Sequence, residues 1–291
     1  MQPSLRQLIT EARKNNRAIG HFNVSNLDAI HAIVSAAEEL NVPVILGVTE
    51  GEQDYIGTEI IVSIVKSLKQ TAKVPVFLNA DHHYSFESVK RAIDAGFDMA
   101  IIDMVKVSLE ENIAITKQCV DYAREISEKT GREILIEAEL GFIGQSSKML
   151  DTIPDGVGEE TMTTVEDAKA FIDATGIDLL APSVGNIHGM VKTGEPDLHS
   201  ERVQAIYDAT DIPLVLHGAS GNTDSDVRAC IESGVAIVHI NTEIRVAYKD
   251  ALVKSLTDTN KDEVAPYKYL PEARDAIKNV VLQKLKVFNN L

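Results

Sequence analysis

An aspartate and two histidines stand together in the chain, directly after an apolar run. The stretch "LNADHH" (78–83) places Asp81 beside His82 and His83. One explanation is a polar turn that begins the next helix. The other is a metal site, because neutral imidazole is a common zinc ligand and a neighbouring carboxylate can move a substrate proton. The choice depends on whether other parts of the chain supply further ligands.

Similar polar residues end several other apolar runs or lie just beyond them. Three neutral imidazoles from separate strands, with an open position for substrate, form a common catalytic zinc site. Carboxylates near such a site orient the imidazoles or hold another cation. These residues are Asn23, Asp103, Glu137, Glu139, His188, His217 and His239. Three other histidines have simpler structural explanations: His31 and His199 on predicted helices, and His21 inside the first predicted strand.

The elements that must position these residues follow one repeating pattern. A short β-branched run leads into a polar turn and then a helical pattern, as in the helices predicted at 27–40 and at 108–130, the latter with Ser108 as its N-cap. Several runs lack strict alternation, as expected of strands covered on both faces. The eight runs lie at 18–24, 43–49, 74–81, 99–104, 133–141, 178–185, 213–220 and 236–243.

Eight strand–helix units with short connections predict one (β/α)₈ TIM barrel, a single catalytic domain over 1–291. A doubly wound sheet would show fewer units and a Gly-rich first turn. The active site of such a barrel lies at the carboxyl ends of its strands. The long irregular stretch 142–164 is therefore predicted to be an active-site loop. Residues from 266 onward predict one or two extra helices on the barrel.

Composition excludes several classes of partner. The net charge of -16 argues against nucleic acid, which needs a basic surface. The chain has neither an apolar stretch near the roughly 18 residues of a membrane span nor the apolar core of a signal peptide. Neither Cys119 nor Cys230 has a C-x-x-C partner, which is typical of reduced thiols. We therefore expect a cytoplasmic protein without a nucleic-acid or membrane partner.

Two turns have the composition of phosphate-binding loops. "HGASG" (217–221) is a small-residue turn before a predicted helix, and "NTE" (241–243) ends the last strand in a similar way. Backbone N–H groups at helix N-termini bind anions, and the loops after strands 7 and 8 are the usual phosphate site of these barrels. The alternative is that Gly218 and Gly221 only make a tight turn.

Taken together, these motifs resemble the class II, metal-dependent ketose-bisphosphate aldolases of the fructose- and tagatose-bisphosphate group. The matching segments occur in the family's order and cover roughly residues 5 to 255. They are "FNV" (22–24), "ADHH" (80–83), "ENI" (111–113), "EAELG" (137–141), "GNIHGMVK" (185–192), "LHGASG" (216–221) and "NTE" (241–243).

By position, the resemblance implies the central chemistry. His82, His188 and His217 bind the catalytic zinc, Asp81 is the acid-base group for the C4 hydroxyl, and Asn23 helps to hold the enediolate. His83 is adjacent to a ligand on a strand, where neighbours face opposite ways, so we expect it to support the turn instead. The implied reaction is reversible cleavage of a ketose 1,6-bisphosphate, most simply fructose 1,6-bisphosphate, to dihydroxyacetone phosphate and an aldehyde phosphate.

The resemblance also implies further binding residues. Asp103 and Glu139 lie beside the metal, where some relatives bind another divalent or monovalent cation. His239 replaces a frequent asparagine near the substrate; it either hydrogen-bonds the substrate or shifts which ketose is accepted. Relatives are dimers or tetramers, so we expect a homodimer or homotetramer. The residues around the phosphate are Gly189 and Lys192, both through their backbone, and Gly218, Ser220, Asn241 and Thr242.

The chain departs from the family at two loops. "DMVKVS" (103–108) replaces the usual Asp-Gly-Ser, and Lys106 there is either a substrate contact or a solvated loop lysine, the simpler interpretation. "GQSSK" (144–148) lacks the glutamate that usually exchanges the C3 proton. The distal phosphate has two candidate partners, Arg245 and Arg274. Four acids that follow the second loop are candidates for the C3 proton donor: Asp151, Asp155, Glu159 and Glu160.

Other functions stay open at this point. A Schiff-base aldolase needs a lysine projecting from a strand, and the predicted strands contain none. A metal-dependent hydrolase would favour H-x-H on the first strand, where this chain has "HFN" (21–23). The altered loops are compatible with a non-catalytic relative of the family. Tagatose bisphosphate or another phosphorylated ketose remains an alternative substrate.

Overall fold

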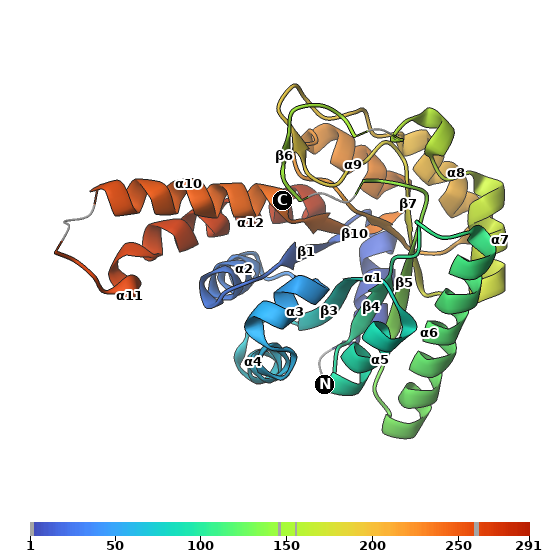
Figure 1. Ribbon diagram of the computed structural model, residues 1–291, viewed down its shortest axis with the longest axis horizontal. Coiled ribbons are helices and arrows are strands. Elements are labelled where there is room, and N and C mark those ends of the chain that lie inside the picture. The colour runs from blue at the N-terminus through green and yellow to red at the C-terminus, as the bar shows by residue number, and fades with distance from the viewer. Residues whose placement is uncertain (1–2, 145–146, 155, 259–261) are drawn as a thin grey trace.

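The computed structural model describes residues 3–144, 147–154, 156–258 and 262–291 (Figure 1). Its central element is a closed barrel of eight parallel strands, in the order β1-β10-β9-β7-β5-β4-β3-β2. This confirms the predicted (β/α)₈ fold. The strands are β1 Ile19–Asn23, β2 Val44–Val48, β3 Val76–His83, β4 Met99–Ile102, β5 Leu135–Leu140, β7 Leu179–Pro182, β9 Leu214–Leu216 and β10 Val235–Ile240.

Helices surround the barrel, and most of them begin at a residue whose side chain caps the helix. The predicted helix at 27–40 is α2, and Ser108 accepts a hydrogen bond from the Glu111 N–H at the start of α6, as predicted. The barrel helices are α1 Leu5–Lys14, α2 Leu27–Leu40, α3 Glu50–Ile56, α4 Thr58–Thr71, α5 Phe86–Ala95, α6 Leu109–Thr130, α7 Val165–Thr175, α8 Ser200–Thr210, α9 Asp224–Ser233 and α10 Thr242–Asp258.

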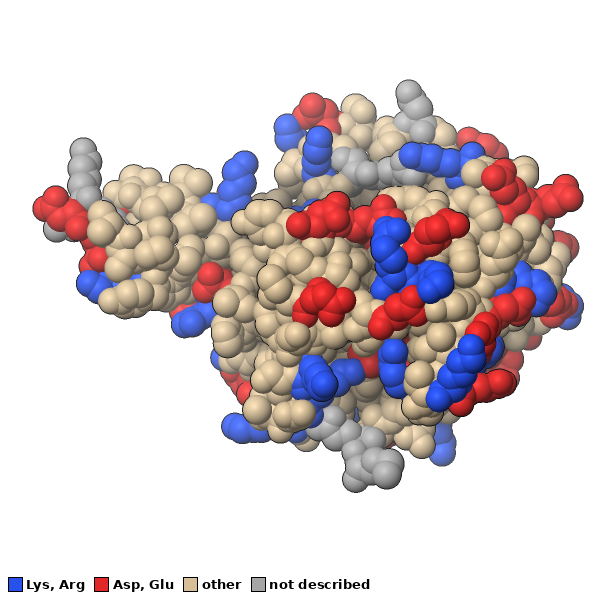
Figure 2. Space-filling view, turned by 60° about the horizontal axis from the view of Figure 1, so that its bottom comes forward, with Lys and Arg blue, Asp and Glu red and all other residues tan. Residues whose placement is uncertain are grey.

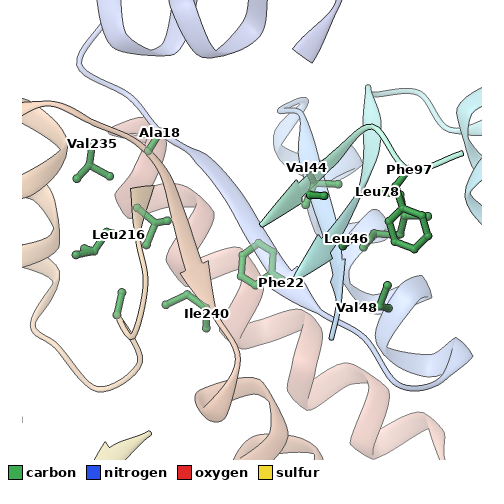
Figure 3. Packing of buried hydrophobic residues seen from close by; sticks show 14 of the residues in the cluster. Ala18, Phe22, Val44, Leu46, Val48, Leu78, Phe97, Leu216, Val235 and Ile240 are labelled. Carbon is green, nitrogen blue, oxygen red and sulfur yellow. The ribbon is translucent and has the colours of Figure 1, made fainter. Parts of the chain in front are cut away.

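Alternating strand residues pack on opposite sides of the barrel wall. Phe22, Leu46 and Leu78 belong to the large core between the strands and the outer helices (Figure 3). A second core lies inside the barrel, where strand residues such as Ile45 pack with Ile9 of α1. Because this interior core is apolar at the end that α1 covers, the polar strand residues collect at the carboxyl end.

The described part of the predicted active-site loop, 142–164, includes a paired strand. Its short strand β6 Met149–Leu150 lies parallel to β8 Met190–Val191, in the segment after β7. A 3₁₀ helix, Glu159–Thr161, follows. The segment that carries His188 is therefore paired with the part of the loop just before Asp151.

Two extra C-terminal helices confirm the prediction from residue 266 onward: α11 Pro266–Tyr269 and α12 Pro271–Asn289. The end of α12 returns to the barrel, where the Phe288 carbonyl accepts a hydrogen bond from the Ala18 N–H. Figure 1 shows α10 and α12 running side by side away from the barrel, with α11 at the far end. We call the part of α10–α12 that lies beyond the barrel the C-terminal arm.

The surface is mixed in charge on the face shown in Figure 2, where acidic and basic side chains are interspersed. Both cysteines are buried and free. Within the described ranges, we find no helix with the length and apolar character that crossing a membrane requires.

Candidate metal and substrate site

A cavity of about 370 Å³ opens at the carboxyl ends of the barrel strands. Its wall combines imidazoles, carboxylates and the two small-residue turns, so most of the predicted site residues meet there. The lining residues are Asn23, Thr49, Glu50, Gly51, Asp81, His82, Tyr84, Asp103, Gly144, Ser147, His188, Gly189, His217, Gly218, Ser220, His239, Asn241, Thr242 and Arg245.

Two of the predicted ligands, His82 and His217, are each fixed by a carboxylate. His82 Nδ1 lies 3.1 Å from Asp103 Oδ2, and His217 Nε2 lies 2.6 Å from Glu137 Oε1. Their remaining nitrogens, His82 Nε2 and His217 Nδ1, face each other at 3.1 Å. A ring nitrogen that is hydrogen-bonded to oxygen sets the orientation of an imidazole and leaves the other nitrogen for a metal.

The third imidazole completes the arrangement. His188 Nδ1 lies 2.8 Å from the Gly144 carbonyl oxygen, which comes from the loop after β5. One ligand atom each from His82, His188, His217 and Glu139 can be chosen so that all lie within 4.8 Å of one another. Glu139 Oε2 is buried without a hydrogen-bond partner. This donor set fits a metal ion, with Glu139 as the free carboxylate and Asp103 as the partner of His82.

Burial and charge set unequal proton affinities in this group. Burial and, after it, the positive charge of His82 together lower the pKa of His188 and of His217 to about 3, which favours their neutral forms. Burial also opposes the charge on His82, but Asp81 and the nearby carboxylates outweigh it and raise the pKa of His82 to about 10. The carboxylates therefore favour one positive charge at the position where the ligands converge.

A local irregularity explains how both Asp81 and His82 reach the cavity. Adjacent strand residues normally face opposite sides of the barrel wall. At His82 the backbone φ is +45°, and the β3–β4 register shifts between Ala80 and His83. This bulge turns His82 back toward the cavity. His83 faces outward and lies 3.0 Å from Gln53 Nε2 of α3, so the structure separates it from the site.

Asp81 of β3 is held by Asn23, which ends β1, two strands away in the barrel. Asn23 Nδ2 donates hydrogen bonds to Asp81 Oδ2 at 2.8 Å and to Glu52 Oε2 at 3.1 Å. Glu52 was not identified from sequence, although the T-x-x-E spacing from Thr49 is a capping-box signal that the structure confirms. Burial opposes the charged form of Asp81, but His82 and His239 outweigh it and hold the pKa of Asp81 well below its usual range.

The two small-residue turns meet beside the metal ligands. Ser220 Oγ accepts hydrogen bonds from the backbone N–H groups of Asn241 and Glu243, each at 3.4 Å. Gly218 has a φ of +59°, and a Cβ there would lie 2.2 Å from the Ile187 carbonyl oxygen. Glycine is therefore required at Gly218 both by its backbone conformation and by the close approach of the segment that carries His188.

The structure separates other predicted residues from the cavity wall. The Lys192 N–H donates to the Leu150 carbonyl, and its side chain pairs with Asp151 at 2.7 Å. Lys106 is exposed in its loop. Arg274 lies on α12 beside Asp275, whereas Arg245 lines the cavity and pairs with Glu52.

The candidate C3 proton donors differ in position. Asp151 is exposed beside Lys192, Glu159 and Glu160 lie in the 3₁₀ helix, and Asp155 falls outside the described residues. His31 is exposed on α2, and His199 precedes α8 and contacts Glu201. No lysine lines the cavity among the residues that the structure describes, so those residues offer no nucleophile for a Schiff base.

A barrel with convergent imidazoles and carboxylates at its carboxyl end belongs to a class of proteins that can hold a catalytic metal there. A family profile described as "Fructose-bisphosphate aldolase class-II" matches residues 3–291. The fructose-bisphosphate aldolase of Staphylococcus aureus is 38% identical over 288 residues, which cover 98% of this chain and 96% of that protein. The fructose-bisphosphate aldolase of Geobacillus stearothermophilus is 38% identical over 290 residues, covering 99% and 96%.

Solved structures agree with these sequence matches. The YdjI aldolase from Escherichia coli has a TM-score of 0.82 at 33% identity, covering 99% of this chain and 97% of that chain. The fructose-bisphosphate aldolase of Campylobacter jejuni has a TM-score of 0.77 at 22% identity and shows a shared fold. The chain therefore belongs to the class II fructose-bisphosphate aldolase family, whose members are metal-dependent carbon–carbon lyases.

Proposed function

We propose that the protein cleaves a ketose 1,6-bisphosphate reversibly to dihydroxyacetone phosphate and an aldehyde phosphate, with zinc as its metal. The observation that supports this most directly is the convergence of His82, His188 and His217 beside Asp81 and the two small-residue turns. Fructose 1,6-bisphosphate is the substrate that the names of the relatives favour. The whole chain, 1–291, would act as one catalytic domain.

Three imidazoles and a free carboxylate suit zinc, with His82, His188 and His217 as ligands. When bound, the metal supplies Lewis-acid stabilisation of the negative charge that develops as the C3–C4 bond breaks. Glu139 and Asp103 would complete this shell or hold another divalent or monovalent cation. Of these two, Glu139 is the better candidate ligand, because Asp103 already accepts a hydrogen bond from His82.

Asp81 would take the proton from the C4 hydroxyl. As that proton leaves, C4 becomes the carbonyl carbon of the aldehyde product, and the C3–C4 electron pair stays on C3. Asn23 fixes Asp81 through the 2.8 Å hydrogen bond and would also contact the oxygens of the three-carbon fragment. His239 lines the cavity next to Asp81 and would contact the substrate hydroxyls. These contacts would hold the Asp81 carboxylate and the substrate hydroxyl in the relative orientation that proton transfer needs.

Phosphate binding would use the two turns and the rim of the cavity. Backbone groups of Gly189 and Gly218, with Ser220, Asn241 and Thr242, surround one side of the cavity. The Lys192 backbone N–H would join them only if its pairing with Leu150 opened. Arg245 lies at the cavity and is the better candidate for the distal phosphate, because Arg274 is on the C-terminal arm.

The C3 proton would be returned by an acid of the active-site loop. Asp151, Glu159 and Glu160 are described candidates, and Asp155 remains one by sequence. Asp151 is already paired with Lys192, so opening of the β6–β8 pair would free both side chains together. The loss of C3 proton exchange on alanine substitution at one of these four positions would identify the donor.

We further propose a cytoplasmic homo-oligomer that acts in carbohydrate metabolism, including glycolysis. The C-terminal arm exposes large apolar side chains, among them Val264 and Tyr267 at 80% and 76% exposure. Exposed apolar groups on a projecting element suit a contact with a second copy. Sedimentation velocity separates a monomer from a dimer or a tetramer.

The decisive experiment is a cleavage assay with fructose, tagatose and sedoheptulose bisphosphates, before and after chelation and after zinc is restored. We expect cleavage of at least one bisphosphate that is lost with zinc and recovered with it. Full activity in a metal-free sample would overturn the mechanism. Bound zinc without cleavage of any bisphosphate would instead support a non-catalytic relative.

A further inference from the structure

Three imidazoles form a stack that runs from the candidate metal site across β10 to β1. The ring of His217 stacks on His239, with centroids 4.0 Å apart and planes 26° apart. His239 stacks in turn on His21, with centroids 3.5 Å apart and planes only 5° apart. His21 is fully buried and lines no part of the cavity, so it has no direct access to a substrate.

Two neighbouring residues leave space for the ring of His21 and fix its orientation. A Cβ on Gly47 of β2 would lie 2.1 Å from His21 Cε1. On the adjacent strand β3, Asn79, the register partner of Gly47, has its Nδ2 3.0 Å from His21 Nε2. The missing side chain at Gly47 therefore makes room for this ring, and Asn79 fixes its rotation. His21 Nδ1 is buried without a hydrogen-bond partner, so burying the ring here costs free energy of folding.

A second metal ion does not explain this arrangement. His21, Asp81 and His239 do have potential ligand atoms within 4.8 Å of one another. However, an imidazole binds a metal in its own plane at about 2.0–2.1 Å. Two stacked, nearly parallel rings cannot both have the same ion in their planes at that distance. The stack is therefore better explained by what it does to His239.

His239 and Asn23 lie near different carboxylate oxygens of Asp81. Its Nδ1 lies 3.6 Å from Asp81 Oδ1, an oxygen that has no hydrogen-bond partner, whereas Asn23 donates to Oδ2 at 2.8 Å. A carboxylate held at only one oxygen can rotate about its last bond. A ring fixed beside the other oxygen restricts that rotation, and catalytic groups must be held within a few tenths of an ångström to react efficiently.

We propose that His21 is a positioning residue for the aldolase reaction: its stacking fixes the plane of His239, and His239 fixes the carboxylate of Asp81 for proton transfer at the C4 hydroxyl. This inference rests on the proposed function, because it needs Asp81 to be the acid-base group. It extends the functional residues to a buried layer that does not touch the substrate.

The test compares two reactions of the zinc-loaded His21→Ala variant. One is cleavage of the preferred bisphosphate, which needs Asp81. The other is exchange of the C3 proton of dihydroxyacetone phosphate with deuterated water, which involves no C4 hydroxyl because this molecule has three carbons. We expect kcat for cleavage to fall about tenfold, with exchange, KM and zinc content each changing less than about twofold. Ile19→Val, which removes a buried methylene group from the same strand, is the matched control.

Equal losses of cleavage and exchange, or no loss of either, would reject the positioning role. Failure of the wild-type protein in both reactions would instead reject the proposed function. Gly47→Ala provides a second measurement that does not depend on His21→Ala being well folded, because its Cβ displaces the His21 ring. We expect Gly47→Ala to reduce cleavage more than exchange.

The double variant His21→Ala, Gly47→Ala completes a cycle. Once the ring is removed, the methyl group at position 47 has space, so the double variant should be no slower in cleavage than His21→Ala alone. Independent losses that multiply in the double variant would show that Gly47 does not act through His21, and would reject the inference.

Discussion

Zinc affinity should depend on pH with a slope that His82 determines. The pKa of His82 is raised to about 10, whereas those of His188 and His217 are lowered to about 3. Among the three imidazoles, therefore, only His82 must lose a proton between pH 6 and 9 before it can bind zinc. We expect the affinity to rise about tenfold per pH unit, and zinc binding to release one proton.

The magnitude follows from the pKa. At pH 7, about three units below it, the competing proton weakens zinc binding about a thousandfold, or about 4 kcal/mol at 1.36 kcal/mol per unit. Chelator competition across this range gives the slope, and calorimetry in two buffers of different ionisation enthalpy counts the protons. Burial also raises the pKa of Glu139, so a slope of two would identify Glu139 as a further ligand.

Asp103→Asn is the control variant for this experiment. It removes a negative charge that helps to hold the proton on His82, so the pH at which the affinity reaches its plateau should fall. A wild-type affinity that is flat between pH 7 and 9 would refute the reasoning. Three ordinary imidazoles titrate near pH 6.5 and would give that flat result.

Three further variants test the proposed roles of single residues. Asp81→Asn should lower kcat for cleavage by about 10²–10⁴ while zinc content, measured by elemental analysis, stays constant. Arg245→Ala should raise KM for a ketose bisphosphate about tenfold to a hundredfold, and KM for the 1-monophosphate much less, as steady-state assays would show. Gly218→Ala combines a φ of +59° with a Cβ 2.2 Å from the Ile187 carbonyl; thermal unfolding should show a destabilisation of about 2 kcal/mol or more.

Sequence periodicity was sufficient to predict the barrel, because strand and helix periods depend on local residue order. The helix predicted at 27–40 has the same bounds in the structure, and all eight predicted runs overlap a barrel strand. The boundaries were less accurate: the run at 213–220 forms only Leu214–Leu216 before the chain turns into the small-residue loop. The glycines after the strand favour a turn, and a prediction from apolar character alone therefore made the strand too long.

The details of the site depend on contacts between distant strands. Strict alternation would send Asp81 and His82 to opposite sides of the barrel wall, and only the bulge at His82 brings both into the cavity. Nothing in "ADHH" indicates that bulge. Glu52 could be recognised as a capping residue, but its hydrogen bond to Asn23 requires β1 and β2 to be neighbours.

The same limit applies to His21, which sequence reasoning assigned to structure alone. Its stacking on His239 exists because β1 pairs with β10, and its space exists because β2, on the other side, carries Gly47. In the barrel register His21 pairs with His239 of β10. On its other side lies β2, where Val44 and Leu46 pair with the residues just before and just after His21. A closed barrel thus joins residues that are far apart in the chain into one layer. The layer beneath the proposed acid-base group is consequently as much a product of strand pairing as the site itself.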